Sequence, residues 1–467
     1  MANARLEPGD VIDGFRIEDL AHNGGMARIW KVSRPDIDFP ILMKVPVIGE
    51  GDDPAAIVGF EMEQMILPRL EGPHVPRFVA NGDFATLPYI VMECLPGTSL
   101  YPEIDRLPLT PEEVAAAGAR VATALDSLHR QHVVHLDLKP SNVMFRAGGE
   151  AVLIDYGLAR HLHLPDLMDE EFRLPYGTAP YMAPEQVLGT RSDFRSDLFA
   201  LGVMLYFFST GERPFGDPQR MKGLKRRLWR DPLPPRARNA AIPPALQEVI
   251  LRCLEVNPAW RYPTAAQLAL DLQDLSAVKL TARAEKMTRD PFGTVMRRRF
   301  NPVPIETVKP QAAEAQLTNA PIVAVAIDVG SSAPELLEAL RGTVTRIIEN
   351  APDARIACIN VLRINRITID TSLDEAGRNK HVLRLVELRS WAQELAMPTG
   401  GITFHVLEAV SPADAILDYA RENYVDHIVM GARAESAMRS MLGSVSGEVA
   451  AHAPCTVTVV RNRPRPA

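Results

Sequence analysis

A short polar run near the middle of the chain brings together the side chains that phosphoryl transfer requires. Asp137, Lys139 and Asn142 lie close together, and Asp155 follows thirteen residues after Asn142, within Asp155-Tyr156-Gly157. One carboxylate can orient a hydroxyl group, an ammonium can neutralise a phosphate, and an amide with a second carboxylate can hold Mg²⁺. An Asp-x-Lys-x-x-Asn pattern followed by Asp-aromatic-Gly, with apolar flanking segments, is far more specific than a lone glycine motif.

The run resembles the catalytic loop and the metal loop of eukaryotic-like Ser/Thr protein kinases. The resemblance implies that Asp137 is the catalytic base, that Lys139 contacts the γ-phosphate of ATP, and that Asn142 and Asp155 bind Mg²⁺. Lysine two residues after the aspartate is the Ser/Thr form of this loop. All four positions are filled, so the sequence gives no reason to regard the kinase as inactive.

The elements that must position this run include a glycine-rich segment near the start of the chain. Residues 14–32 carry alternating apolar side chains on both sides of Gly24 and Gly25, which predicts a β-hairpin whose backbone amides could cover phosphates. The kinase resemblance implies that Ile29 caps the adenine ring. Histidine and alanine stand where the family usually has its outer glycines, so a plain hairpin is the alternative.

The next candidate is Lys44, which interrupts the apolar strand predicted at 41–45. A lysine in a buried strand must be paired, because an unpaired buried charge costs several kcal/mol. The resemblance places Glu63, on a helix predicted over 60–70, against this lysine, with Glu61 as the second choice. A snorkelling surface lysine and a solvated glutamate are the alternative.

An apolar strand that ends in a turn, residues 89–97, resembles the hinge between the two lobes of a kinase. In that family the backbone from Glu93 to Leu95 would hydrogen-bond adenine, and Met92 would border the back pocket. The alternative is a simple edge strand.

The resemblance also implies structural roles in the C-lobe. Thr178 should hydrogen-bond Asp137, Glu185 should pair with Arg261, and Asp197 should hold the backbone of the catalytic loop. A basic cluster over 222–230 could dock acidic substrates, but a charge run on a helix usually forms a solvated face, which we prefer.

Two departures from the kinase pattern concern regulation. Leu136 stands where many kinases have an arginine that binds a phosphate on the activation loop. Residues 158–176 contain no serine or threonine, and they include acidic side chains at Asp166, Asp169, Glu170 and Glu171. The segment thus lacks a residue that could be phosphorylated, and the catalytic loop lacks the arginine that would bind the phosphate.

We therefore hypothesise that phosphorylation of residues 158–176 does not switch this kinase on. The active protein should carry no phosphate in this segment, which phosphopeptide mass spectrometry of the purified chain can check. A stoichiometric, activating phosphate between Leu158 and Tyr176 would refute the hypothesis.

The C-terminal part has a different pattern, in which apolar strands alternate with amphipathic helices. Strands are expected at 322–328, 355–362, 402–407, 427–430 and 456–460, and helices at 334–348, 380–395 and 412–422. This alternation predicts a doubly wound α/β parallel sheet with ligands at the carboxyl ends of its strands. With Asp328 ending the first strand, the region resembles a universal stress protein domain.

That resemblance implies an ATP site. Asp328 and Val361 would meet adenine or ribose, and the phosphates would meet Gly431, Arg433, Gly443, Ser444 and Ser446. The glycine pattern departs from that of the ATP-binding branch, because alanine replaces its second glycine and the spacer has eight residues instead of nine. The alternative is a nucleotide-free fold that dimerises through its last strand.

Composition sets the domain plan and excludes some functions. The 467 residues, 46% hydrophobic and 23% charged, allow two or more domains. We place an α+β bilobal kinase domain at 1–276, with lobes at about 11–92 and 96–276, the universal stress protein domain at 321–462, and between them a linker at 277–320 that could be partly ordered against the kinase lobe. The net charge of -7 argues against nucleic acid or an anionic membrane as partner. Four scattered cysteines and no apolar signal segment favour a bacterial cytoplasm.

These features predict a Ser/Thr protein kinase that uses ATP and Mg²⁺ to phosphorylate protein substrates, including itself. The C-terminal domain would sense an adenine nucleotide or form a homodimer, and nucleotide bound near Gly431 would alter kinase turnover. The alternative is a catalytically weak kinase-fold scaffold that serves as a nucleotide sensor. A scaffold has no need to retain Lys44, Asp137 and Asp155, so their presence favours the enzyme.

Overall fold

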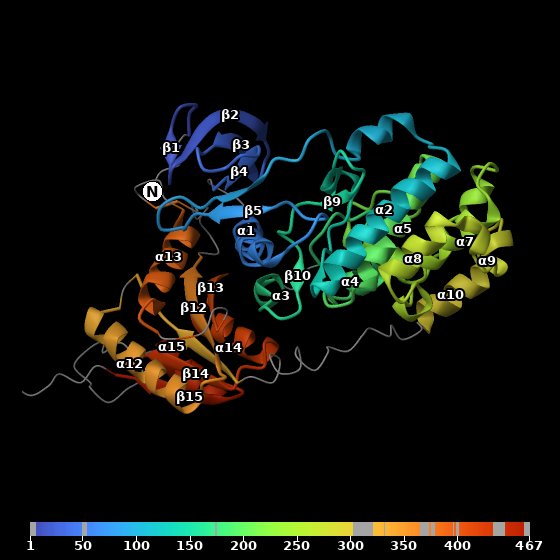
Figure 1. Ribbon diagram of the computed structural model, residues 1–467. Helices are drawn as coiled ribbons and strands as arrows, with labels where there is room; N and C mark the ends of the chain where they lie inside the picture. Colours follow the sequence, from blue (N-terminus) through green and yellow to red (C-terminus); the bar gives the residue numbers. More distant parts are fainter. Residues whose placement is uncertain are drawn as a thin grey trace, which may run out of the picture.

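The computed structural model describes residues 6–48, 54–172, 175–301, 321–330, 332–364, 373–374, 379–395, 397, 401–432 and 444–461. Figure 1 shows a small sheet with helix α1, a largely helical lobe beside it, and a separate α/β unit formed by the C-terminal part of the chain. A bilobal kinase fold followed by a doubly wound domain, as the sequence predicted, is the architecture observed.

The N-lobe is built on an antiparallel sheet in the order β1-β2-β3-β4-β6-β5. Its strands are β1 Val11–Ile12, β2 Phe15–Asn23, β3 Ala27–Ser33, β4 Ile41–Pro46, β5 Phe78–Asn81 and β6 Ile90–Glu93. Because side chains alternate along a strand, Ile41 and Met43 enter a buried cluster on one face, and Lys44 points to the other face. Helix α1, Pro54–Ile66, is longer at its start than the predicted helix and ends in a 3₁₀ turn at Leu67–Arg69, which contains Pro68.

The C-lobe is mainly helical around one apolar core. Its elements are α2 Pro111–Arg130, α3 Leu167–Glu171, α4 Pro184–Val187, α5 Arg195–Thr210, α6 Met221–Leu224, α7 Pro244–Cys253 and α8 Ala265–Gln273, with the short strands β7 Val133–Val134, β8 Val143–Phe145, β9 Ala151–Leu153 and β10 Arg160–His161. Helix α2 begins with a capping box between Thr110 and Glu113. Along the described ranges of the chain, no helix is both long and apolar enough to span a membrane.

The first part of the predicted linker is folded onto the C-lobe. Residues 277–301 contain α9 Ala282–Glu285 and α10 Phe292–Phe300. Gln247 of α7 donates hydrogen bonds to the carbonyl oxygens of Arg283 and Ala284, at 2.8 and 3.0 Å. The segment shows little apolar periodicity, and polar contacts to its backbone help to hold it in place.

The C-terminal domain is a parallel sheet in the order β13-β12-β11-β14-β15. Its elements are β11 Ile322–Ala326, α12 Pro334–Asn350, β12 Arg355–Arg363, α13 Lys380–Ala392, β13 Ile402–Ala409, α14 Pro412–Glu422, β14 His427–Gly431, α15 Ser444–His452 and β15 Thr456–Val460. In β11, Val325 clusters with Leu340 of α12, and its neighbour Ala324 clusters with Ile416 of α14. Helices therefore cover both faces of the sheet, which explains the near-continuous apolar strands.

Candidate functional site

Asp137 lies at the centre of a compact hydrogen-bond network in the C-lobe. Its Oδ1 accepts from the N–H and the hydroxyl of Thr178, at 2.9 and 2.7 Å, and its Oδ2 lies 2.6 Å from Lys139 Nζ. Lys139 Nζ also donates to Thr178 Oγ1 at 3.1 Å, and Asn142 Nδ2 donates to the Asp137 carbonyl at 3.0 Å. The expected contact of Thr178 is present, and the network fixes the orientation of the Asp137 carboxylate.

The backbone beside Asp137 is held in an unfavourable conformation. Leu136 has a φ of +62°, which L residues other than glycine rarely adopt and which costs about 1–3 kcal/mol. The buried carboxylate of Asp197 accepts from the N–H groups of His135 and Leu136, both at 2.8 Å, as expected. Gln186 Nε2 donates to the Leu136 carbonyl at 2.9 Å. These bonds stabilise a loop shape that the isolated chain would not keep.

Lys44 connects the N-lobe sheet to α1 and to the metal loop. Its Nζ lies 2.6 Å from Glu63 Oε2 and 3.1 Å from Asp155 Oδ1, and Glu63 is buried. Burial by itself would lower the pKa of Lys44, but the carboxylates of Asp155 and Glu63 raise it above its ordinary value. The Lys44 ammonium lowers the pKa of Asp155 to about 2, against the effect of burial. Both groups are therefore charged at neutral pH.

Helix α1 lies directly against the loop that carries Asp155. A Cβ atom added to Gly59 of α1 would lie 3.1 Å from the carbonyl oxygen of Gly157, so a larger residue would push the two apart. Tyr156, which lies between Asp155 and Gly157 in the sequence, is fully buried and donates through its hydroxyl to the Leu153 carbonyl at 2.9 Å. The position of α1 and that of Asp155 are thus coupled by packing as well as by charge.

Asn142 and Asp155 have the chemistry of a magnesium site. The backbone N–H of Ile154, next to Asp155, donates to the Asn142 carbonyl at 3.0 Å, so the two residues lie on neighbouring segments. The Asp155 side chain is 46% exposed although it pairs with Lys44. Mg²⁺ is usually held by one or two protein oxygen ligands together with substrate phosphates. This donor set fits that pattern, and in the described ranges no group of three or more His, Cys, Asp or Glu forms a different metal site.

The glycine-rich segment forms the predicted hairpin between β2 and β3. Gly24 N–H donates to the Ala27 carbonyl at 3.0 Å and closes the turn, and nothing lies within 4 Å of a Cβ placed on Gly25. Ile29 is in β3, in register with Lys44 of β4. The turn is therefore open on the side of Gly25.

The hinge strand is fastened to both lobes. Glu93 pairs with Arg146 of the C-lobe, whose Nε also donates to the Pro73 carbonyl at 2.8 Å. Cys94 N–H donates to the Pro40 carbonyl at 2.8 Å, whereas Leu95 N–H has no hydrogen-bond partner in the part of the chain that is described. Leu95 therefore offers a backbone donor to a ligand.

Arg227, in the basic cluster that we interpreted as a solvated face, is buried instead. It donates to the carbonyl oxygens of Ala179 and Met182, with 2.7 Å to Ala179. Burial lowers the pKa of Arg227 to about 10. The interpretation was wrong at this position, because an arginine fork can satisfy several carbonyls of the segment before α4 at once.

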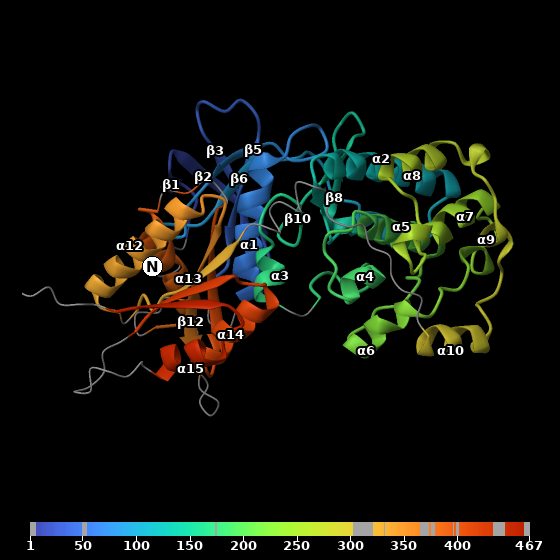
Figure 2. The same ribbon diagram turned by 90° about the horizontal axis from the view of Figure 1, so that it is seen from below.

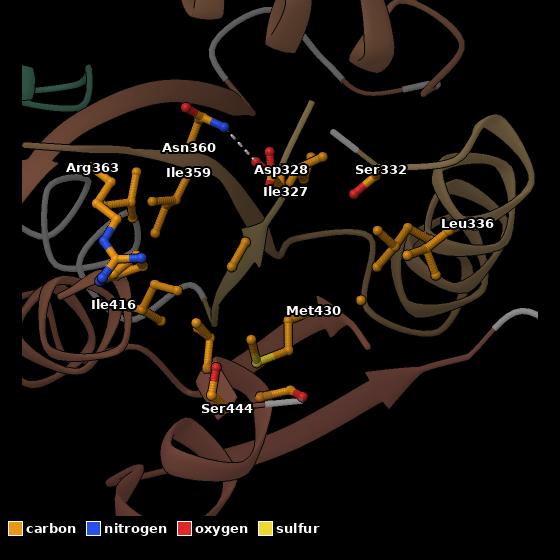
Figure 3. A pocket seen from close by; sticks show the side chains of 17 residues that line it. Ile327, Asp328, Ser332, Leu336, Ile359, Asn360, Arg363, Ile416, Met430 and Ser444 are labelled. Carbon is orange, nitrogen blue, oxygen red and sulfur yellow. Dashed lines mark hydrogen bonds between the residues drawn. The ribbon is translucent and has the colours of Figure 1, made fainter. Parts of the chain in front are cut away.

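The C-terminal domain has a cavity of about 420 Å³ at the carboxyl ends of its strands (Figure 3). Of the predicted nucleotide contacts, Asp328, Val361, Gly431, Ser444 and Ser446 line it. Arg433 and Gly443 lie outside the described residues.

The sequence reasoning missed three polar residues that also line this cavity, Ser332, Asn360 and Arg363. Asn360 Nδ2 donates to the Ile327 carbonyl at 2.8 Å, and its buried Oδ1 has no hydrogen-bond partner among the described residues. A single amide in an otherwise apolar strand was the signal that could have revealed it.

Comparisons with known proteins agree with both halves of this description. Residues 49–271 match the family model of the protein kinase domain, and residues 320–461 match that of the universal stress protein family. Serine/threonine-protein kinase PknB of Mycobacterium tuberculosis is 30% identical over 270 residues, which are 57% of this chain and 43% of the relative. A probable serine/threonine-protein kinase of Clostridium perfringens is 28% identical over 282 residues, 60% of this chain and 39% of the relative.

This chain thus spans less than half the length of these curated relatives. Among solved structures, the PknI kinase domain of Mycobacterium tuberculosis aligns with a TM-score of 0.46 and 24% identity, over 58% of this chain and 100% of that one.

Proposed function

Because this chain joins a protein kinase domain to a universal stress protein domain, we propose that it transfers the γ-phosphoryl group of ATP to Ser and Thr hydroxyls of protein substrates, itself included. One observation carries the proposal, the arrangement of two groups of charged residues. Lys44 is paired with both Glu63 and Asp155. Asp137 and Lys139 contact each other beside Thr178. Phosphoryl transfer depends on positioning and on charge stabilisation, and this arrangement supplies both.

Each residue then has a definite part in the reaction. The acceptor hydroxyl donates its proton toward Asp137, whose carboxylate is oriented by Thr178. Lys139 neutralises charge on the γ-phosphoryl oxygens, and Lys44 binds the phosphates that remain on the leaving nucleotide. Bound by Asn142 and Asp155, Mg²⁺ would supply further neutralisation of the phosphate charge.

Adenine binds in this proposal at the hinge. Leu95 N–H is available as a donor to a ring nitrogen, and Ile29 covers the base from β3. Gly24 and Gly25 place the hairpin turn over the phosphates. The two outer glycines of the family pattern are absent here, so the turn relies on these two residues for close approach.

The test is transfer of label from γ-labelled ATP with Mg²⁺ to the chain itself and to a basic acceptor protein. Wild-type protein should incorporate phosphate on Ser or Thr, and Asp155→Asn should not. ATP binding without incorporation by the wild-type chain would overturn the proposal and favour a kinase-fold scaffold that senses nucleotide.

For the C-terminal domain we propose an adenine-nucleotide site in the 420 Å³ cavity. The buried, unpartnered Oδ1 of Asn360 supports it, since a buried acceptor without a donor is costly unless a ligand provides one. Asp328, Ser444 and Ser446 line the cavity, and in this proposal Asp328 accepts from a ribose hydroxyl while the two serines donate to phosphates at the start of α15.

Gly443→Asp should abolish nucleotide binding to this domain and change kinase turnover, measured by calorimetry and by the transfer assay on the same folded variant. The added carboxylate repels phosphate, which is the reason for the expected loss. Kinase turnover that is the same in the wild-type chain and in Gly443→Asp would refute a sensing role. If neither protein binds nucleotide at this domain and the chain is a dimer in solution, assembly through β15 is favoured, because β15 lies at an edge of the sheet.

A further inference from the structure

The C-terminal domain packs against two elements of the kinase domain, α1 and α3. Figures 1 and 2 both place α14 beside α3, and Figure 1 shows α13 and the edge strand β13 facing the N-lobe. Buried apolar side chains of the kinase domain and of the α12 and α13 side of the sheet form one continuous cluster. The contact is therefore a packed interface within the chain.

On α1, the contact is made by Glu61 and by Arg389 of α13. Their side chains form an ion pair in which Glu61 is buried. The Arg389 guanidinium lies 5.4 Å from the ring centre of Phe84 in the kinase domain and 5.6 Å from that of Phe404 in β13. Glu61 had been our second choice as partner of Lys44. Its partner is instead a cation from the other domain.

At the end of α3, two acidic residues of the segment 158–176 contact side chains of the C-terminal domain. Glu170 pairs with Arg355 of β12 and accepts from the Tyr419 hydroxyl at 3.0 Å. Glu171 Oε1 lies 3.0 Å from His405 Nδ1. Burial would lower the pKa of His405, but Glu170 and Glu171 raise it to about 9, so the imidazole is a cation at neutral pH. The interface thus joins kinase carboxylates to cations of the C-terminal domain.

The other end of α3 is fixed within the kinase domain. Asp166 caps α3 and accepts from Arg191 Nε at 2.8 Å, and Arg191 Nη2 donates to the Leu158 carbonyl at 3.0 Å. Leu167 and Met168 are buried between these anchors and α1. Helix α3 is therefore tied at its start by the C-lobe and at its end by the C-terminal domain.

Helix geometry connects this interface to the reaction site. Glu61 and Glu63 are two residues apart on α1, so their side chains point to opposite sides of the helix. Glu63 reaches Lys44 on one side, and Glu61 reaches Arg389 on the other. A shift of α1 that broke one pair would strain the other.

We propose that Arg389, Arg355 and His405 are positioning residues for the kinase reaction. Through them the C-terminal domain holds α1 and α3 where Lys44, Glu63 and Asp155 meet, the task that a phosphate on the activation segment performs in kinases of the regulated type. The inference rests on the proposed kinase function. It explains why the segment that lacks serine and threonine is rich in acidic residues.

The test compares full-length variants in the transfer assay. Arg389→Gln and Arg355→Gln should each lower kcat about 10- to 100-fold, because small displacements of catalytic groups cost factors of this size. The KM for ATP should change little, since the hinge is untouched. Hydrogen exchange of α1 and α3 should rise in both variants. Arg389→Lys keeps the charge and should retain more activity than Arg389→Gln.

A double-mutant cycle separates the contact from nonspecific damage. Glu61→Gln combined with Arg389→Gln should lose no more activity than either single change, because both remove the same pair. The matched control is Arg421→Gln, which removes an exposed ion pair with Asp418 within α14 and should leave kcat unchanged.

The outcomes distinguish this inference from the proposed function. Transfer by the wild-type chain with unchanged or increased kcat in Arg389→Gln and Arg355→Gln would overturn the inference alone. A loss of kcat in the Glu61→Gln, Arg389→Gln double variant that equals the product of the two single losses would also overturn it. Absence of transfer by the wild-type chain would overturn the proposed function and this inference with it.

Discussion

Asp155→Asn should lower kcat about 10²–10³-fold or more, since it removes a charge that acts directly on the transferring group. The carboxylate contacts Lys44 at 3.1 Å and is the charged half of the predicted magnesium pair with Asn142. Asparagine keeps the shape of the side chain and tolerates the φ of +70° at this position. The loss should therefore come from charge and not from a distorted loop. Initial rates of label transfer at saturating ATP and Mg²⁺ measure it.

The matched control for this substitution is Asp36→Asn, which removes a carboxylate on the N-lobe surface whose one ion pair within the described ranges is with Arg34. Its kcat should equal that of the wild-type chain. Equal residual activity in Asp155→Asn and Asp36→Asn, with both proteins folded by circular dichroism, would contradict the assignment of Asp155 to the reaction.

The local parts of the kinase site could be predicted because short motifs constrain their own geometry. Asp137, Lys139 and Asn142 lie on one loop, so their mutual distances depend on few backbone angles. The pairing of Lys44 with Glu63 followed from energetics, since a buried lysine requires a counter-charge. Strand and helix positions in the C-terminal domain followed from apolar periodicity, although β11 ends at Ala326, two residues before Asp328, and β12 and β13 extend one and two residues beyond the predicted strands.

Contacts between distant elements could not be predicted in the same way. Nothing in the residues around Glu61 indicates that its partner is Arg389, more than 300 positions away, because an ion pair leaves no periodic signal. Arg227 was mistaken for a surface residue for a related reason: the two residues before it, Lys225 and Arg226, are basic and exposed, but its own partners are backbone carbonyls. Part of the predicted linker at 277–320 forms α9 and α10 against the C-lobe, and composition does not reveal the polar contacts that hold this part.

Glu185→Gln should destabilise the kinase domain by about 3–5 kcal/mol, because it leaves a buried guanidinium without its counter-charge. Glu185 and Arg261 have fully buried side chains joined by two hydrogen bonds of 2.7 and 2.8 Å, as expected for this pair. Ser196 also donates to Glu185 at 2.7 Å, and Arg261 donates to the Arg195 carbonyl at 2.9 Å. The pair thus fastens α4, which contains Glu185, to the start of α5. The measurement is the shift of the kinase-domain transition in chemical denaturation.

Glu212→Gln is the matched control, since Glu212 pairs with Arg238 at an exposed position of the same lobe. Exposed pairs contribute only about 0–1 kcal/mol, so this variant should unfold almost like the wild-type chain. Replacing both partners, as Glu185→Leu with Arg261→Met, should cost less than Glu185→Gln, because no buried charge then remains uncompensated. A transition of Glu185→Gln that coincides with that of Glu212→Gln would show that the buried pair does not brace the C-lobe, and the network around Arg261 would need another source of stability.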